Sequence, residues 1–328
     1  MVLKSNGGSW KTRWTVLPTT GGRAHLSSLD KNPDEHIRKY GLDLPAETCI
    51  GIQLTRILSY DIARYEFRNG HSPCKGHILL LHGYVLHSLC QASLISHLVS
   101  KGWHVTAFDW PGHGLSSGKR ASICDFRIYS EVLSSIIDSF DQSARHPLHL
   151  IAHSTGCSAW IEYVHHSQSK PFDKVILVSP LIRNAAWRSS LLGIWIADRM
   201  GWNLVPRIFR RSSHDPAYLR LMRNDPLSPW VIPIQWSRSL IRWQSLLASS
   251  PAHGLNATVF QGTRDSVIDW RFGLRTIRRL FPHVSVVQWK GQRHDLLNEG
   301  YPIRTRVFDA VDRIVSLETH PTPDSFGA

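Results

Sequence analysis

Short apolar runs recur along most of the chain and alternate with amphipathic segments. The runs have the continuous hydrophobicity of buried parallel strands: GHILLLHGY, WHVTAFDW, LHLIA, KVILV, ATVFQ and VSVVQW. Between them, apolar residues recur at helical spacing over residues 91–101, 130–140, 156–165 and 303–316. Strands that alternate with helices predict an α/β fold, a mostly parallel central sheet with helices on both faces.

Two parts of the chain depart from this alternation. Residues 55–60 and 62–67 predict a pair of adjacent strands that are separated by Asp61 and end at an Asn-Gly turn. Residues 181–250 carry helical patterns without a convincing strand, and strand-type sequence resumes with ATVFQ. We therefore predict that residues 181–250 form a helical cap inserted between the sixth and seventh strands of one core.

The remaining boundaries follow from composition. The polar, glycine-rich start predicts weak order, followed by a short capped helix over 30–42. The expected organisation is a partly ordered N-terminal extension, a core in two pieces around the cap, and a loose tail: 1–50, 51–180 with 251–317, and 318–328.

Composition narrows the class of protein. A chain of 328 residues that is 42% hydrophobic and 19% charged is ordinary for a globular protein. No apolar run approaches the roughly 20 residues that span a bilayer, and the start MVLKSNGGSWKTRW lacks the apolar core of a secretory signal. The five cysteines are an odd number without a CxxC pair, so neither a disulfide framework nor a zinc site is expected. The expectation is a soluble, cytoplasmic protein.

The net charge of +13 indicates one of two things, an anionic binding partner or a basic surface that is simply exposed to solvent. Nucleic acid is not expected, because the chain has no lysine-rich tail, helix-turn-helix or RNA-binding signature. Acidic substrates and the anionic inner face of a membrane, contacted peripherally, remain as candidates.

The stretch LHLIAHSTG places Ser154 between a predicted strand and a predicted helix. Such a sharp turn exposes a serine hydroxyl, and the helix N-terminus stabilises negative charge that develops beside it. The usual pattern is G-x-S-x-G, and here Ala152 replaces the first glycine. A serine in an ordinary strand–helix loop is the alternative interpretation. Cys157 is expected to be a small buried thiol in the helix rather than a second nucleophile.

A serine needs a base to remove its proton and an acid to orient that base. Asp265 follows the strand ATVFQ and His294 follows VSVVQW, so both are expected at the carboxyl edge of the sheet together with Ser154. Asp269 and Asp295 compete with Asp265 for the role of the acid. Three other histidines are expected to pack or to shape loops: His82, His113 and His153.

An acyl-transfer site also needs backbone N–H groups for the oxyanion. The amide of Thr155 directly follows the serine at the helix N-terminus. The second donor is expected in the tight bend that His82-Gly83 opens after a buried strand. The next amide, that of Tyr84, is the natural candidate, and its side chain is not needed for this contact.

The segments HGYVLHS, FDWPGHGLSSG, AHSTG, GTRD and GQRHDLLNE occur in this order and resemble the α/β-hydrolase family. The closest branch is that of monoacylglycerol lipases and lysophospholipases, also grouped with the serine aminopeptidases, and the resemblance covers residues 55–316. It implies an α/β-hydrolase fold, a triad of Ser154, Asp265 and His294, and no metal or organic cofactor. It also implies that the loop that begins at Asp109 is structural.

The composition of the cap suggests a substrate. Residues 181–250 contain ten arginines, three aspartates and no lysine or glutamate. They also hold six of the 13 tryptophans: Trp187, Trp195, Trp202, Trp230, Trp236 and Trp243. Tryptophan with arginine is typical of surfaces that contact lipid headgroups, so we expect an ester of a lipid-like molecule with one long chain, a lysophospholipid or a monoacylglycerol. The alternative is that these residues only pack and decorate the cap helices.

Two other functions remain open at this point. A peptidase of the proline iminopeptidase type would need an acidic patch to bind an amino terminus, and the cap has little acid to offer. A binding protein on an inactive hydrolase fold would not need serine, aspartate and histidine to be retained together.

Overall fold

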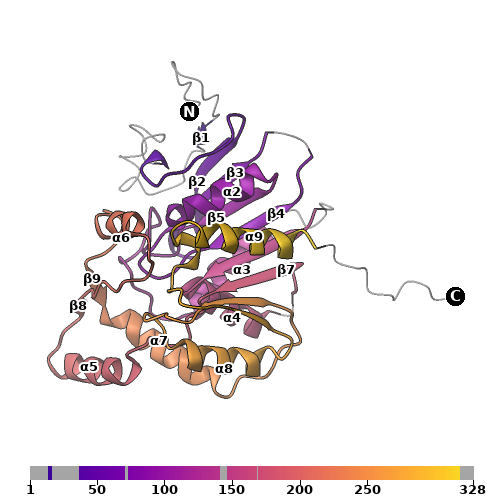
Figure 1. The fold of residues 1–328 in the computed structure, drawn as a ribbon. Coiled ribbons are helices and arrows are strands. Elements are labelled where there is room, and N and C mark those ends of the chain that lie inside the picture. Colours follow the sequence, from indigo (N-terminus) through magenta and orange to yellow (C-terminus); the bar gives the residue numbers. More distant parts are fainter. Residues whose placement is uncertain (1–13, 17–36, 71–72, 141–145, 168, 318–328) are drawn as a thin grey trace.

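The computed structural model describes residues 14–16, 37–70, 73–140, 146–167 and 169–317 (Figure 1). Nine strands form one sheet in the order β1-β2-β3-β5-β4-β6-β7-β10-β11. Their bounds are β1 Trp14–Val16, β2 Cys49–Ile57, β3 Tyr60–Arg68, β4 His77–Leu81, β5 His104–Phe108, β6 Leu148–His153, β7 Lys174–Val178, β10 Thr258–Gly262 and β11 Ser285–Trp289. The six strands from β5 to β11 are parallel, whereas β3 runs antiparallel to both of its neighbours. The predicted mostly parallel α/β sheet is therefore confirmed.

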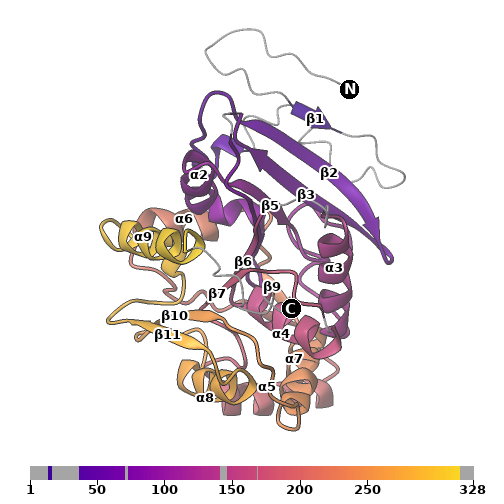
Figure 2. The same cartoon turned by 90° about the vertical axis from the view of Figure 1, so that its right-hand side faces the viewer.

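Helices cover both faces of this sheet. Their bounds are α2 Ala92–Ser100, α3 Arg127–Asp138, α4 Thr155–His166, α5 Trp187–Arg199, α6 Pro216–Arg223, α7 Ile234–Leu247, α8 Trp270–Leu280 and α9 Ile303–Val315, with 3-10 turns η1 Ser88–Gln91 and η2 Leu296–Asn298. Figure 2 shows α2 and α9 on one side of the sheet and α3 and α4 on the other. The helices predicted over 91–101, 130–140, 156–165 and 303–316 correspond to α2, α3, α4 and α9.

The core strands are buried on both sides, which explains their continuous hydrophobicity. In β4, Ile78 and Leu80 pack with α2 and α9, and Leu79 and Leu81 pack with α3 and α4. All four side chains are at most 1% exposed. Burial of each stabilises the fold by about 1.5–3 kcal/mol relative to exposure. This alternation fixes the register of the sheet, because a slip of one residue would exchange the two faces.

The first hairpin differs from the prediction. Its turn is Leu58-Ser59, between β2 and β3, with Leu58 in the left-handed region at φ 53°. Asp61 does not separate the strands. It lies within β3 and accepts a hydrogen bond of 2.9 Å from Arg56, its cross-strand partner. The strand β2 begins at Cys49, slightly before the expected start of the core.

Residues 181–250, the segment predicted to be a cap and called the cap below, contain α5, β8 Leu204–Pro206, α6, β9 Val231–Pro233 and α7. The prediction of a cap without strands is wrong, because β8 and β9 form a separate antiparallel pair. Each has only three residues, too few to show an alternating pattern. The cap elements α5, α6, β8 and β9 lie along the left side of Figure 1.

Most of the predicted N-terminal helix and the predicted loose tail lie outside the described residues. Of the range 30–42, only the last residues are described, and Ile37 and Tyr40 there are buried in the core. Within the described ranges, no helix combines the length and the apolarity that crossing a bilayer requires.

Candidate functional site

Ser154 occupies a strained turn between β6 and α4. Its backbone angles are φ 51° and ψ −111°, a conformation that L-residues rarely adopt and that costs on the order of 1–3 kcal/mol. The start of α4 also lies close to the end of the neighbouring strand β4, since a Cβ on Gly156 would lie 2.8 Å from the carbonyl oxygen of Leu81. Ala152 is fully buried in β6 and its methyl group is accommodated, so the elbow forms without the first glycine of the usual pattern.

The structure brings Ser154, His294 and Asp265 together from three loops at one edge of the sheet. The Oγ of Ser154 lies 3.1 Å from Nε2 of His294, and Nδ1 of His294 lies 2.7 Å from Oδ2 of Asp265. With the proton on Nδ1, the imidazole donates to the carboxylate and accepts from the serine hydroxyl. All three residues are less than 9% exposed.

Further hydrogen bonds hold Asp265 in this position. Its Oδ1 accepts the backbone amides of Val267 at 2.8 Å and Ile268 at 3.1 Å, and its Oδ2 accepts Nε2 of Gln261 at 3.2 Å. Burial acts to raise the pKa of Asp265, but the positive charge and hydrogen bond of His294 and the two amides outweigh it and hold the pKa below its usual value.

The imidazole of His294 has a raised pKa. Burial acts to lower it, but the charge and hydrogen bond of Asp265, with a smaller effect of the Asp295 carboxylate, outweigh that effect. A raised pKa makes the imidazole a stronger base for the proton of a serine hydroxyl.

The two competing aspartates have other partners. Asp269 caps α8 by accepting the amide of Phe272 at 3.1 Å and pairs with Arg183 at 2.7 Å. Asp295 lies 3.2 Å from Nε2 of His153. The His153 ring stands 5.0 Å from that of His294, and burial lowers its pKa to about 4.

The other histidines of the site shape loops, as predicted. His82 donates from Nδ1 to the carbonyl of Gly83 at 2.8 Å and accepts the backbone amide of Trp110 at 3.0 Å. His113 lies 3.0 Å from the carbonyl of Pro111. Burial lowers the pKa of both His82 and His113 to about 3. Neutral, buried imidazoles with backbone partners do not exchange protons with a substrate.

Two backbone segments adjoin the serine where oxyanion donors are expected. A Cβ on Gly83 would lie 3.1 Å from the Cβ of Ser154, so the 83–84 backbone runs directly beside the hydroxyl. The Tyr84 side chain is engaged elsewhere, since its hydroxyl donates to the carbonyl of Ala121 at 2.7 Å and its ring stacks on Trp236. Thr155 is the first residue of α4, and the first N–H groups of a helix have no partner within it.

Asp109 organises a buried loop and does not touch the triad. Its carboxylate accepts the amides of Ser88 and Leu115, both at 2.8 Å, and the hydroxyl of Tyr65 at 3.0 Å. Cys157 is also buried, burial raises the pKa of its thiol, and it donates to the carbonyl of Ala152 at 3.1 Å. Neither residue offers chemistry to a substrate.

A cavity of about 490 Å³ extends from Ser154 and His294 into the cap. Its apolar wall includes Leu86, Leu181, Phe209, Leu219, Met222, Ile232, Trp236 and Leu240. Four arginines also line it: Arg207, Arg210, Arg211 and Arg223. Within the described ranges, none of these four guanidiniums forms an ion pair with a carboxylate. The space therefore combines an apolar wall with uncompensated positive charge.

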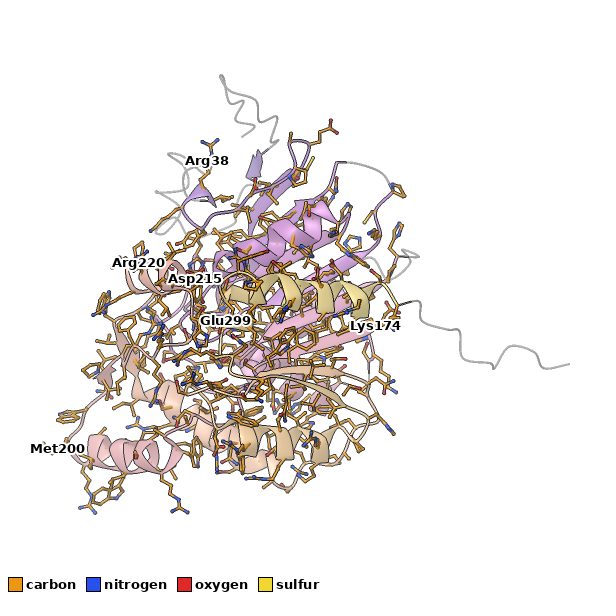
Figure 3. All side chains as sticks on the ribbon, in the orientation of Figure 1. Arg38, Lys174, Met200, Asp215, Arg220 and Glu299 are labelled. Carbon is orange, nitrogen blue, oxygen red and sulfur yellow. The ribbon has the colours of Figure 1, made fainter. Side chains whose placement is uncertain are left out.

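One residue that supports the site was not predicted as part of it. Glu299, at the end of GQRHDLLNE, is 1% exposed and is labelled in the interior in Figure 3. It accepts the backbone amides of His214 at 2.7 Å and Arg293 at 3.1 Å, and so joins the cap to the loop that carries His294. A glutamate that ends an apolar run in sequence was the available signal.

Comparison with known proteins finds relatives in sequence and in fold. Over 247 residues, 71% of this chain and 92% of its own length, the phospholipase YtpA of Bacillus subtilis is 24% identical. A soluble variant of monoglyceride lipase from Saccharomyces cerevisiae superimposes with a TM-score of 0.69 at 18% identity, covering 80% of this chain and 94% of that one. The monoacylglycerol lipase of Paleococcus ferrophilus gives 0.66 at 22% identity, covering 78% and 99%.

These structures share the α/β-hydrolase fold with this chain. Residues 72–300, well over half of the sequence, match the family described as serine aminopeptidase, S33. The chain belongs to this family of α/β-hydrolases.

Proposed function

We propose that the chain is a serine hydrolase that cleaves the carboxylic ester of a lipid-like substrate, a lysophospholipid or a monoacylglycerol, through an acyl-enzyme. Ser154 attacks the ester carbonyl while His294 takes its proton, and Asp265 orients the imidazole and stabilises its charge. The amides of Tyr84 and Thr155 bind the oxyanion. The observation that carries this proposal is the contact of His294 with both Ser154 and Asp265.

The second half of the reaction uses the same groups. His294 donates its proton to the leaving alcohol, and water enters the site that the alcohol vacates. The imidazole then removes a proton from this water as it attacks the acyl carbonyl, and Ser154 recovers its proton as the acid leaves. The chain supplies every group that these steps require.

The cavity favours a substrate with one acyl chain and an anionic head. Its apolar wall suits an alkyl chain, and the unpaired guanidiniums suit a phosphate, which arginine binds through two parallel hydrogen bonds. The most buried of the four is Arg207, which contacts the carbonyl of Pro229 at 3.3 Å. We therefore place lysophospholipids ahead of the uncharged monoacylglycerols.

An aminopeptidase reaction has less support. Binding of a free amino terminus needs carboxylates, and all three cap aspartates have partners in the protein. Asp198 pairs with Arg238, Asp215 caps α6, and Asp225 pairs with His87. Asp295 is the one carboxylate among the residues that line the described cavity, and it faces His153.

The outer face of the cap supports peripheral contact with an anionic membrane. Only Ala197 of α5 is buried, although the helix contains LLGIWIA. Trp195, Trp202 and Trp230 are each more than half exposed, whereas Trp236 and Trp243 are buried in the core. Figure 3 places Met200, at the end of this helix, on the periphery of the molecule. Interfacial and packing roles are thus divided among the tryptophans.

Labelling with a fluorescent fluorophosphonate tests the nucleophile. We expect Ser154→Ala to abolish labelling and hydrolysis. Ser237→Ala is the matched control, because Ser237 lines the same cavity without touching the triad. Equal labelling of the Ser154→Ala protein would refute the assignment.

Substrate class is tested with a monoacylglycerol, a lysophosphatidylglycerol of the same acyl chain and a prolyl arylamide. A higher kcat/KM for the arylamide than for both lipids would favour the peptidase.

Sedimentation with vesicles tests the membrane contact. We expect binding to phosphatidylglycerol vesicles and less binding after Trp195→Ser with Trp202→Ser. Tyr301→Ser is the control, since Tyr301 is an exposed aromatic residue outside the cap. Equal loss in the control and the double variant would count against a specific interfacial face.

A further inference from the structure

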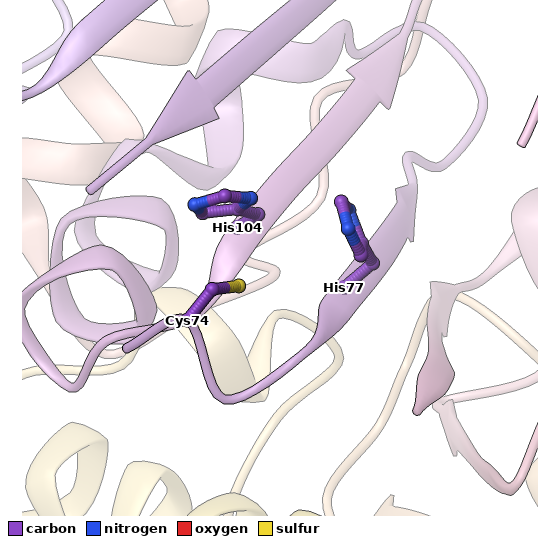
Figure 4. Close-up of side chains that lie close together, drawn as sticks. All are labelled: Cys74, His77 and His104. Atoms are coloured by element: carbon purple, nitrogen blue, oxygen red, sulfur yellow. The ribbon is translucent and has the colours of Figure 1, made fainter. Parts of the chain in front are cut away.

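Three side chains with metal-binding atoms lie together at the amino edge of the sheet. His77 and His104 begin the neighbouring strands β4 and β5 and are direct partners in register. Cys74 precedes His77 by three residues. The thiol sulfur and one nitrogen of each imidazole all lie within 4.8 Å of one another. Figure 4 shows the thiol of Cys74 directed into the space between the two rings.

The cluster differs from the two other groups of this kind in the described part of the chain. Those groups are fully buried, and each contains a histidine that already contacts a carboxylate: His87 with Asp225, and His153 with Asp295. Cys74, His77 and His104 are only partly buried and therefore accessible to an ion from solvent. Their donor set is one sulfur and two imidazole nitrogens.

We propose that Cys74, His77 and His104 bind a zinc ion, with water as the fourth ligand. Thiolate and imidazole are the preferred ligands of zinc, at about 2.3 Å and 2.0–2.1 Å in a tetrahedral arrangement. That geometry places the ligand atoms about 3.3–3.6 Å apart, and since they already lie within 4.8 Å of one another, the side chains need to close by no more than about 1.5 Å. Rotation of partly buried side chains provides a movement of this size without a change in the backbone.

The backbone around the cluster is already fixed. The amide of His104 donates to the carbonyl of Gly76 at 3.0 Å, and the amide of Lys75 donates to that of Gly102 at 3.1 Å. The amide of His77 donates to the carbonyl of Pro147 at 2.8 Å. The first two bonds tie the loop of Cys74 to β5 and the residues before it, and the third ties the start of β4 to the residue before β6. A site whose backbone is ordered in advance loses little entropy when the ion binds.

Neighbouring groups also suit a bound cation. The imidazole of His104 hydrogen-bonds to the backbone of Asn69, a contact of the type that fixes the orientation and tautomer of metal-binding histidines. The nearby arginines, Arg64 and Arg68, both pair with Glu66, at 3.1 and 2.6 Å. A cavity of about 390 Å³ that His77 and His104 line gives the fourth ligand access from solvent.

The site is far from the triad. Six residues of extended chain separate His77 from Gly83, which places the two sites about 20 Å apart at opposite edges of the sheet. Figure 3 labels Lys174, which begins β7 at the amino edge, on the side of the molecule away from Met200 and Arg220 of the cap. Zinc here would cross-link the loop before β4 to β5 and would stabilise this edge of the sheet, away from the triad.

The test uses untagged full-length protein stripped with chelator and reloaded with one equivalent of zinc or cobalt. We expect one equivalent to remain after gel filtration, a thiolate-to-cobalt charge-transfer band in the near ultraviolet, and a higher Tm in the loaded protein. Cys74→Ser should remove the charge-transfer band and lower the affinity for the metal by about a hundredfold or more. This exceeds the loss of about 10–100-fold that is typical when a residue that only hydrogen-bonds to a metal ligand is replaced. His104→Asn is the second variant, and should weaken binding while the thiolate band remains at saturating cobalt.

Cys124→Ser is the matched control, because Cys124 is an exposed thiol elsewhere in the chain. It should leave stoichiometry and spectrum unchanged. The proposal is overturned if no thiolate band forms, or if Cys74→Ser and Cys124→Ser bind cobalt with the same spectrum and affinity. The proposal is also overturned if one equivalent of zinc inhibits hydrolysis stoichiometrically and His104→Asn leaves that inhibition unchanged. The retained zinc would then be bound at Ser154 and not at Cys74, His77 and His104.

Discussion

A buried ion pair joins the cap to the core, and its removal gives a quantitative test of the fold. Asp225, directly after α6 in the cap, is 1% exposed. Its carboxylate accepts Nε2 of His87 at 2.8 Å, the hydroxyl of Tyr40 at 2.9 Å and the amide of Leu227 at 3.0 Å. His87 follows the loop of Tyr84, so this contact also supports the expected oxyanion donor. Asp225→Asn removes the charge but keeps the volume.

The expected cost is large because His87 remains buried without its counter-charge. Breaking a buried pair from one side typically costs 3–5 kcal/mol. For a chain of 328 residues that is a fall in Tm of about 4–7 °C. Asp215→Asn is the matched control, since Asp215 caps α6 through backbone amides and asparagine caps as well. Thermal melts of the two variants that coincide would refute the reasoning.

The sign of the pH dependence follows from the two pKa shifts. Burial acts to lower the pKa of His87, but Cys90 and the bond to Asp225 raise it well above 6.5. The stability that His87 contributes to the folded state is therefore complete below pH 6.5 and declines as the pH rises through the pKa of His87 in the folded state. Burial acts to raise the pKa of Asp225, but the bond to His87 lowers it below 3.8. The stability that Asp225 contributes to the folded state is therefore complete above pH 3.8 and declines as the pH falls through the pKa of Asp225 in the folded state. The difference in Tm between wild type and Asp225→Asn should therefore be largest between pH 3.8 and pH 6.5.

Three further predictions concern the site. Asp265→Asn should lower kcat/KM for an ester by about 10³–10⁴-fold, because the imidazole loses its orienting partner, whereas Asp269→Asn should change it little. A comparable loss in both variants would contradict the assignment. The kcat/KM of the wild type should rise with pH and level off above 6.5, since His294 acts as a base and its pKa is raised; a profile that levels off below 6.5 would exclude this. Arg207→Gln with Arg211→Gln should lower kcat/KM for lysophosphatidylglycerol by about tenfold to a hundredfold relative to monoacylglycerol, which is the loss of charged hydrogen bonds. Equal rate changes for the two lipids would remove the case for phosphate binding.

Much of the site was predictable because parallel topology turns sequence order into position. Ser154 and His294 are 140 residues apart, yet each follows a core strand, and the carboxyl ends of parallel strands meet at one edge. The hydrogen-bond partners were not predictable in this way. Gln261 and Glu299 are buried polar residues, and which groups satisfy such residues depends on segments that are brought close only by the fold.

The periodicity of the sequence does not predict which helices of the cap are covered. The helix α5 carries the apolar run LLGIWIA, as a buried helix would, and the sequence does not indicate that this run stays uncovered. In α7, Trp236 and Trp243 join the core, whereas α5 buries Ala197 alone. The predicted position of the first hairpin turn was wrong for a different reason. Leu58-Ser59 contains no glycine, proline or asparagine, and Leu58 adopts a left-handed conformation that glycine or asparagine normally supplies.

The distribution of the positive charge over the molecule follows in part from the way in which the acids are used. Asp109, Asp225, Asp265, Asp295 and Glu299 are all at most 8% exposed, and each is committed to holding a loop or a histidine. These carboxylates are buried inside the structure, while the arginines of the cap remain at the cavity and on the surface. The charge of +13 is therefore not spread evenly over a solvated surface. Because ten arginines lie in residues 181–250 and four of them line the cavity, salt should slow the hydrolysis of an anionic lipid far more than that of a neutral one. Equal salt sensitivity for the two lipids would mean that this charge has no part in substrate binding.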